Sequence, residues 1–155
     1  MRGSIRKEKS LGNPKNKELT QRVRKVNLLI MNEKILIVDD EPQIHVVLSK
    51  LLQKEGYLVF HAYNAEEAFK EVEKERPDLI LLDIMMPKVS GIEVCNRLKE
   101  NPQTKEILIM ILSAKDAQAD RLEGFTHGAD DYVSKPFHLR SLIRKIQHML
   151  QKKQA

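Results

Sequence analysis

The sequence predicts an α/β protein in which a doubly wound parallel sheet is built from five βα units. Three observations lead to this class. Short runs rich in Ile, Leu and Val alternate with segments of helical periodicity from residue 33 onward. The runs ILIV and LILL contain no polar residue, so helices should cover both faces of those strands. Polar side chains follow several runs directly, as is typical of strands that end at the ligand-binding edge of an open sheet.

The expected strands are short and apolar, and they recur in step with the helical segments. Their ranges are 34–38, 57–62, 78–82, 106–112 and 130–134. Right-handed crossovers between parallel strands would place helices on both faces of the sheet. Periodicity alone leaves the strand order open. The order 2-1-3-4-5 is the expected one, because its reversal point lies beside the acidic residues that follow the first and third strands.

The helices between these strands are predicted from apolar stripes and from end signals. The stripes fall within residues 44–52, 65–72 and 139–150. End signals agree with these ranges: a proline for a first turn, two pairs with the spacing of an N-cap and its reciprocal partner, and two glycines for helix ends. These signals are Pro42, Asn64 with Glu67, Ser90 with Glu93, Gly56 and Gly128.

Acidic side chains follow two of the strands and point to a metal site. Asp39 and Asp40 come directly after the first strand, and Asp83 follows the third. Three carboxylates at one sheet edge would repel one another unless a divalent cation held them, and Mg²⁺ prefers oxygen ligands of this kind. The alternative is structural: Asp39 and Asp40 as a cap and turn, and Asp83 as a turn residue before Pro87. We favour a metal-bound, nucleophilic Asp83.

A hydroxyl and an ammonium group complete the predicted cluster. Ser113 ends the fourth strand, and Lys135 follows the fifth strand and precedes Pro136. A cis bond before Pro136 would direct Lys135 over the sheet edge, toward Asp83 or a phosphoryl oxygen. The structural alternatives are a helix-capping serine and a solvated lysine.

Composition and charge limit the classes of function. The net charge of +5 is uneven: residues 1–31 carry nine basic and two acidic residues, while residues 32–155 carry 18 basic and 20 acidic residues. We interpret residues 1–31 as a flexible basic leader, partly vector-like in its opening MRGS, and residues 32–155 as the globular domain. Within the leader, the amphipathic segment 19–30 allows a short helix. Such a leader could also contact nucleic acid or an anionic membrane.

The remaining sequence features argue for a reducing compartment. Cys95 is the only cysteine, so no intrachain disulfide can form, and its expected role is to pack against the sheet. No apolar stretch approaches the ~20 residues that span a bilayer. The protein is therefore expected to be cytoplasmic and without a membrane partner. The five histidines have no zinc-ligand spacing, so surface or helix positions are expected for them.

Four segments together resemble the receiver domains of two-component response regulators, which have the CheY-like, flavodoxin-like fold. These segments are IVDDEP, PDLILLDIMMPKVSGIEV, LSAK and GADDYVSKPF. Each is weak alone, but they occur in the right order and at the right intervals over residues 33–150.

The resemblance implies a role for each matching residue. Asp83 would be the phosphoacceptor, with Asp39, Asp40, Asp83 and the backbone carbonyl of Met85 holding Mg²⁺, or Mn²⁺ in its place. Ser113 and Lys135 would bind the phosphoryl group. Tyr132 would be an aromatic switch, although the sequence fits a half-buried strand residue equally well.

The resemblance also implies partners. A sensor histidine kinase or phosphotransfer protein would donate the phosphoryl group, and an unidentified downstream protein would read the surface of the fourth helix, fifth strand and fifth helix. The same surface would allow a weak dimer of an otherwise monomeric protein. The protein would then be a switch with at most slow autodephosphorylation, not an enzyme.

Three alternative functions remain open from the sequence. The chain could be a receiver fragment of a DNA-binding transcriptional regulator, with DNA as a partner only if an output domain is missing from it. It could be a Mg²⁺-dependent phosphatase with an aspartate nucleophile, although such enzymes usually carry an acidic general acid where Met85 stands. A binding module that never meets phosphate is the third alternative.

Overall fold

The computed structural model describes residues 13–30, 32–114 and 118–154. Contacts divide the chain into two compact units, Met1–Met31 and Asn32–Ala155. In the first unit, α1 spans Pro14–Ile30, so the helix expected over residues 19–30 begins five residues earlier. The side chain of Asn13 accepts a hydrogen bond from the backbone N–H of Lys15 at the start of this helix. Residues 1–12, which the sequence assigns to a flexible leader, lie outside the described residues.

The second unit contains a five-stranded sheet in which neighbouring strands are parallel. Its strands are β1 Lys34–Val38, β2 Leu58–Ala62, β3 Leu79–Asp83, β4 Leu108–Ser113 and β5 Asp131–Ser134. They lie in the order β2-β1-β3-β4-β5, which confirms the predicted class and strand order. The central strand β3 is buried along its whole length, as expected for an apolar run covered on both faces.

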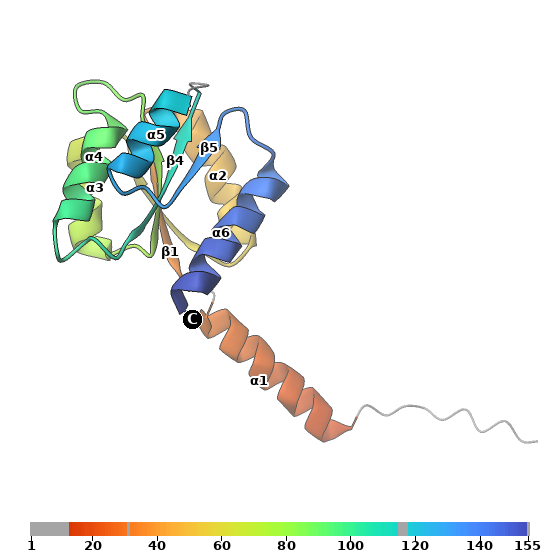
Figure 1. The fold of residues 1–155 in the computed structure, drawn as a ribbon. Helices are drawn as coiled ribbons and strands as arrows, with labels where there is room; N and C mark the ends of the chain where they lie inside the picture. Colours follow the sequence, from red (N-terminus) through yellow and green to blue (C-terminus); the bar gives the residue numbers. More distant parts are fainter. Residues whose placement is uncertain (1–12, 31, 115–117, 155) are drawn as a thin grey trace, which may run out of the picture. The chain divides into compact units, whose positions relative to one another are not determined.

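Five helices connect and follow the strands of this unit. They are α2 Pro42–Lys54, α3 Ala65–Glu75, α4 Gly91–Glu100, α5 Gln118–Thr126 and α6 Leu139–Gln154. Two apolar clusters show how the helices divide between the faces: α3 and α4 pack on one face, and α2 and α6 pack on the other (Figure 1). Alternate strand residues enter the two clusters; Leu36 belongs to the first and Ile37 to the second. The sheet is therefore the middle of three layers.

The helix-end signals operate largely as expected. Asn64 accepts a hydrogen bond from the backbone N–H of Glu67 over 2.9 Å. The carboxylate of Glu67 binds the N–H of Tyr63 instead of that of Asn64, so the reciprocal bond lies one residue earlier than predicted. Gly56 and Gly128 both have φ of 93°, the left-handed conformation in which glycine ends a helix.

Ser90 caps α4 by accepting a hydrogen bond from the backbone N–H of Glu93 over 3.3 Å. The carboxylate of Glu93 does not return the bond; it pairs with Arg97 one turn later. The cap and this ion pair hold the first turns of α4 directly after the loop that follows β3. That loop carries part of the candidate site.

Candidate functional site

Three carboxylates meet at the carboxyl end of the central strands. Asp39 follows β1, Asp40 comes next, and Asp83 is the last residue of β3. One oxygen from each of them lies within 4.8 Å of the others. Asp39 and Asp83 are buried, whereas Asp40 is exposed. The predicted convergence is therefore correct, because β1 and β3 are hydrogen-bonded neighbours whose ends are level.

The loops hold two of these carboxylates by short backbone contacts. Asp39 accepts a hydrogen bond from the backbone N–H of Glu41 over 2.9 Å, and Asp83 accepts one from that of Met85 over 3.2 Å. Gly91 allows the loop after β3 to close tightly, since a Cβ there would lie 2.1 Å from the carbonyl oxygen of Asp83. Any side chain at position 91 would therefore displace the backbone that carries Asp83.

Lys135 enters the site from the loop after β5. Its backbone N–H donates to the carbonyl of Ser113 over 2.7 Å, and the bond to Pro136 is cis. The Nζ atom lies 2.7 Å from Asp39 Oδ2 and 3.9 Å from Asp83 Oδ1. The sequence predicted that Lys135 would pair with Asp83 or with a phosphoryl oxygen; the structure places it beside Asp83, and closer still to Asp39.

The charges of the site do not balance. Three carboxylates and one ammonium leave a formal charge of −2 at the sheet edge. Burial is the main reason that the pKa of Asp83 is raised; Lys135 opposes the shift, Asp39 and Asp40 add to it, and the Met85 N–H opposes it. A divalent cation would neutralise the remaining charge. The hard oxygen donors also match the preference of Mg²⁺, so this set of residues fits the ion.

Ser113 and Tyr132 lie on the strands next to β3. Ser113 ends β4 one residue beyond Leu112, which pairs with Asp83, so it stands at the same edge of the sheet. Its side chain is fully buried. Tyr132 pairs with Ile111 in the sheet, is 3% exposed and belongs to the apolar cluster on the α3 and α4 face. The tyrosine is therefore buried and not half-buried as the sequence allowed.

Two histidines, the buried His45 and the half-buried His61, support the loop of Asp39, and sequence reasoning missed their contact. His45 occupies one of the expected helix positions, in α2, but it is buried there, with 2% exposure. Its Nε2 lies 2.7 Å from the carbonyl oxygen of Asp39 and its Nδ1 lies 2.8 Å from Nδ1 of His61, while its ring stacks on Tyr63 at 4.2 Å. The available signal was spacing, because His45 lies three residues before Leu48 on the inner face of α2.

The partners of His45 fix where its proton resides. A carbonyl oxygen only accepts hydrogen bonds, so Nε2 of His45 must carry a proton. When His45 is neutral, its Nδ1 is an acceptor, and Nδ1–H of His61 is then the donor between the rings. Burial and the neighbouring His45 lower the pKa of His61, and Glu71 opposes the shift. The two hydrogen bonds of His45 therefore link α2, β2 and the Asp39 loop.

The chain belongs to the response regulator receiver domain family, whose pattern it matches over residues 35–147. Over 122 residues it is 45% identical to the alkaline phosphatase synthesis transcriptional regulatory protein PhoP of Bacillus subtilis, a match that covers 79% of this chain and 50% of that protein. The chain thus spans about half the length of this curated relative.

Solved structures of similar proteins support the assignment to this family. A putative response regulator from Chloroflexus aurantiacus has 33% identity and a TM-score of 0.73, with 77% of this chain and 98% of that chain covered. A CheY-like receiver domain protein from Methanospirillum hungatei has 29% identity and a TM-score of 0.74, with coverage of 79% and 96%. The chemotaxis protein CheY4 of Vibrio cholerae has 32% identity and a TM-score of 0.71, with coverage of 75% and 97%.

Within residues 13–30, 32–114 and 118–154, no helix combines the length and the apolar character of a membrane-spanning helix.

Proposed function

We propose that Asp83 accepts a phosphoryl group from a sensor histidine kinase or phosphotransfer protein, and that this modification switches the surface that a downstream partner reads. The observation that supports this most directly is the convergence of Asp83 with Asp39, Asp40 and Lys135 at the carboxyl edge of the sheet. Membership of the receiver family makes a signalling switch the expected activity. A cytoplasmic location follows from the same proposal, since such kinases act on partners in that compartment.

The proposed transfer is a substitution at phosphorus. A carboxylate oxygen of Asp83 attacks the phosphorus of a phosphohistidine, a P–O bond forms, and the P–N bond breaks with its electron pair leaving on the imidazole. The imidazole then takes a proton from solvent. Lys135, whose Nζ is 3.9 Å from Asp83, reduces the negative charge that builds up on the phosphoryl oxygens.

The acidic residues would hold the metal that this chemistry requires. We assign Asp39, Asp40, Asp83 and the backbone carbonyl of Met85 to Mg²⁺, with Mn²⁺ as an alternative. The ion supplies charge neutralisation at the phosphoryl group. Asp39 is held by the N–H of Glu41 and by Lys135, so its carboxylate keeps its position whichever phosphodonor is used.

The switch itself would involve Ser113 and Tyr132. The acyl phosphate carries about −2 of charge where the ionised Asp83 carboxylate carries −1, and the Ser113 hydroxyl at the same edge can donate to it. Movement of Ser113 and the packing of Tyr132 would together reshape the surface of α5, β5 and α6. Shifting a two-state equilibrium from 1:99 to 99:1 requires about 5.5 kcal/mol. Several charge-assisted hydrogen bonds of roughly 1.5–3 kcal/mol each are sufficient.

Phosphorylation by acetyl phosphate tests the proposal. With Mg²⁺ present, intact-mass measurement should find one phosphoryl group on the wild type and none on Asp83→Asn. Asp131→Asn, which changes a carboxylate paired with Lys145 outside the site, is the matched control and should be labelled normally. Labelling of Asp83→Asn at the wild-type level would refute Asp83 as the acceptor.

A second candidate function is the receiver portion of a DNA-binding transcriptional regulator. It is favoured by the relative from Bacillus subtilis, whose name describes a transcriptional regulatory protein about twice as long as the match. The basic residues 1–31 offer a separate route to DNA. If they bind it, binding should weaken as salt increases and disappear when residues 1–31 are removed.

The phosphatase alternative is disfavoured by the residue at position 85. Met85 has no proton to donate to a leaving group, and it is half exposed beside Asp83. Sustained turnover of a small phosphoester that depends on Asp83 would restore this alternative.

A further inference from the structure

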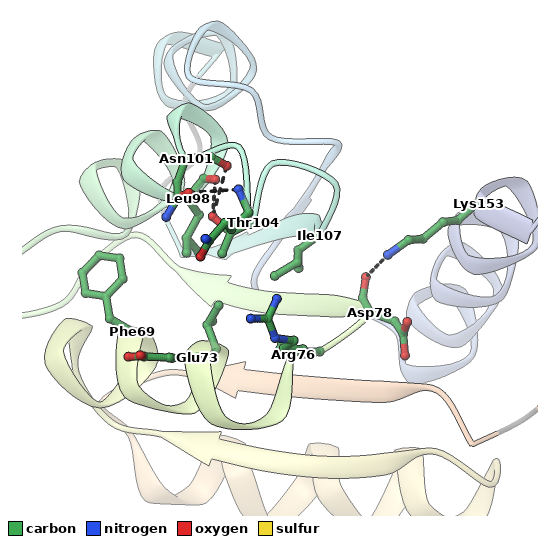
Figure 2. Close-up of a pocket in the computed structure, with 12 residues that line it drawn as sticks. Phe69, Glu73, Arg76, Asp78, Leu98, Asn101, Thr104, Ile107 and Lys153 are labelled. Carbon is green, nitrogen blue, oxygen red and sulfur yellow. Dashed lines mark hydrogen bonds between the residues drawn. The ribbon is translucent and has the colours of Figure 1, made fainter.

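A cavity of about 490 Å³ lies between α3 and α4, near the amino end of β3 (Figure 2). Asp78, which immediately precedes β3, is part of its lining. Asp83 ends the same strand, so the cavity and the phosphoacceptor site occupy opposite edges of the sheet. The volume is in the range of pockets that enclose small organic ligands.

One side of the cavity is apolar and already formed. Phe69 and Val72 of α3, Leu98 of α4 and Ile107 before β4 line it. Three of these four side chains are buried and belong to the cluster on this face of the sheet, against which Phe69 also packs. The hydroxyl of Thr104 donates to the carbonyl of Leu98 over 2.7 Å, which ties the loop after α4 to the helix. The wall is therefore held in place by packing that the domain already has.

Polar residues also line the cavity, and among them is the exposed arginine Arg76. Arg76 caps α3 in the left-handed conformation with φ of 48°, and its backbone N–H donates to the carbonyl of Val72. Figure 2 shows its side chain directed into the space between α3 and the loop that carries Thr104. Across residues 13–30, 32–114 and 118–154, no side chain or carbonyl pairs with this guanidinium.

Other cations near this region are already occupied. Lys99 contacts Asp130 over 2.8 Å, and Arg97 pairs with Glu93. Lys153, at the rim, donates to the carbonyl of Asp78 over 3.4 Å. Arg76 therefore differs from its neighbours in presenting a planar set of donors to a cavity with an apolar wall.

We propose that this cavity binds a small organic monocarboxylate with an apolar body. A carboxylate matches the two parallel donors of a guanidinium, and the apolar body would cover the wall of Val72, Leu98 and Ile107. The charged residues of the lining are Arg76, Lys153, Glu73 and Asp78, whose formal charges cancel. Glu73 and Asp78 would repel a phosphate dianion more strongly than a monoanion, so the monoanion is the better match.

Amide chemical shifts in a titration with naphthalene-2-carboxylate test this proposal. At about 5 mM ligand, a weak pocket with a Kd in the millimolar range should already be partly filled. The shifts should concentrate at Val72, Leu98, Thr104 and Ile107. Naphthalene-2-carboxamide has the same ring system without the charge, and it should bind at least about tenfold more weakly.

Two variants distinguish the contribution of the Arg76 guanidinium to affinity from the general effect of removing a positive charge. Arg76→Gln should weaken naphthalene-2-carboxylate binding about tenfold and bring it to the level of the carboxamide. Arg144→Gln removes an exposed arginine from α6, outside the cavity, and should leave the affinity unchanged. The wild-type comparison of acid with amide needs no variant, so it stands even if Arg76→Gln folds poorly.

Three results would each overturn the proposal. They are an absence of shifts at saturating probe, shifts that map away from α3 and α4, and equal affinity of the acid and the amide. Because the cavity is remote from Asp83, the outcome does not depend on whether phosphorylation takes place.

Discussion

At the residue scale, the surroundings of Asp83 disfavour ionisation of its carboxyl group. The carboxyl group is 4% exposed and shares the sheet edge with two further carboxylates. Its pKa is raised above the ordinary 3.8, mainly by burial. The proposed function depends on this unfavourable charge. A divalent cation, or a covalent bond to phosphorus, would stabilise a carboxylate that is costly to keep charged.

Replacing this carboxylate should stabilise the protein when no divalent ion is present. A folded-state pKa above the unfolded value contributes stability that is complete below the unfolded pKa and is lost as pH rises through the folded pKa. In EDTA, Asp83→Asn should therefore raise the free energy of unfolding at pH 7 by roughly 1 to 3 kcal/mol, the range for a buried charged group with incomplete hydrogen bonding.

Urea denaturation at several pH values measures this effect. The advantage of Asp83→Asn should shrink as pH falls through the raised folded-state pKa and then below 3.8, because the wild-type carboxyl then becomes protonated in both the folded and the unfolded state. It should also shrink when Mg²⁺ is added, because the ion stabilises the charged wild-type site. A gain that is constant from pH 4 to pH 8 would contradict the electrostatic explanation.

The histidine pair makes a second prediction at this scale. His45→Phe keeps an aromatic ring but removes both hydrogen bonds, which leaves the Asp39 carbonyl and His61 Nδ1 without these partners. A loss of about 1 to 3 kcal/mol in the free energy of unfolding is expected. His148→Phe, at an exposed position of α6, is the control and should change stability little. Equal effects of the two substitutions would show that the pair has no structural role.

The site carboxylates were predictable and the histidine pair was not, for a physical reason. Asp39, Asp83 and Ser113 lie at strand ends, and parallel strands bring their ends together whatever the details of packing. The link between His45 and His61 depends on how α2 sits against β2, which periodicity does not specify. The preference of Lys135 for Asp39 also depends on side-chain geometry that the sequence leaves open.

At the element scale, the cap of α3 fixes the end of the loop between β2 and α3. Asn64 caps α3 and Glu67 binds the N–H of Tyr63, whose ring stacks on His45. Asn64→Ala should lower the free energy of unfolding by about 1 kcal/mol, the usual value of an N-cap. Thermal unfolding measures the change, and Asn64→Asp, which keeps an acceptor oxygen, should restore most of it. If Asp fails to restore stability, the side-chain bond to Glu67 is not the source of the effect.

The boundaries of the strands were predicted less well than their existence. β3 begins at Leu79 and β4 at Leu108, one and two residues later than expected. Asp78 stands just before the strand, where its carboxylate accepts the backbone N–H of Lys34 over 2.8 Å. Such side-chain contacts to the backbone over long sequence distances move an element's end without changing its periodicity.

At the scale of the whole molecule, the chain divides into two compact units, Met1–Met31 and Asn32–Ala155. We expect the second unit to fold without residues 1–31. A protein that starts at residue 32 should unfold within about 1 °C of the full chain, because a change of 1 kcal/mol would move the midpoint by several degrees. Calorimetry measures this midpoint. A fall of more than about 4 °C would mean that the basic helix contributes to the stability of the receiver domain.

The interior position of β1 governs how the chain acquires structure while it leaves the ribosome. Ile35 pairs with Val59 on one side and with Leu79 on the other, so the earliest strand needs two later ones. Until β3 has been synthesised, the run KILIV keeps one open hydrogen-bonding edge, and pairing between distant parallel strands is slow. We therefore expect a chaperone to bind this run in the nascent receiver domain.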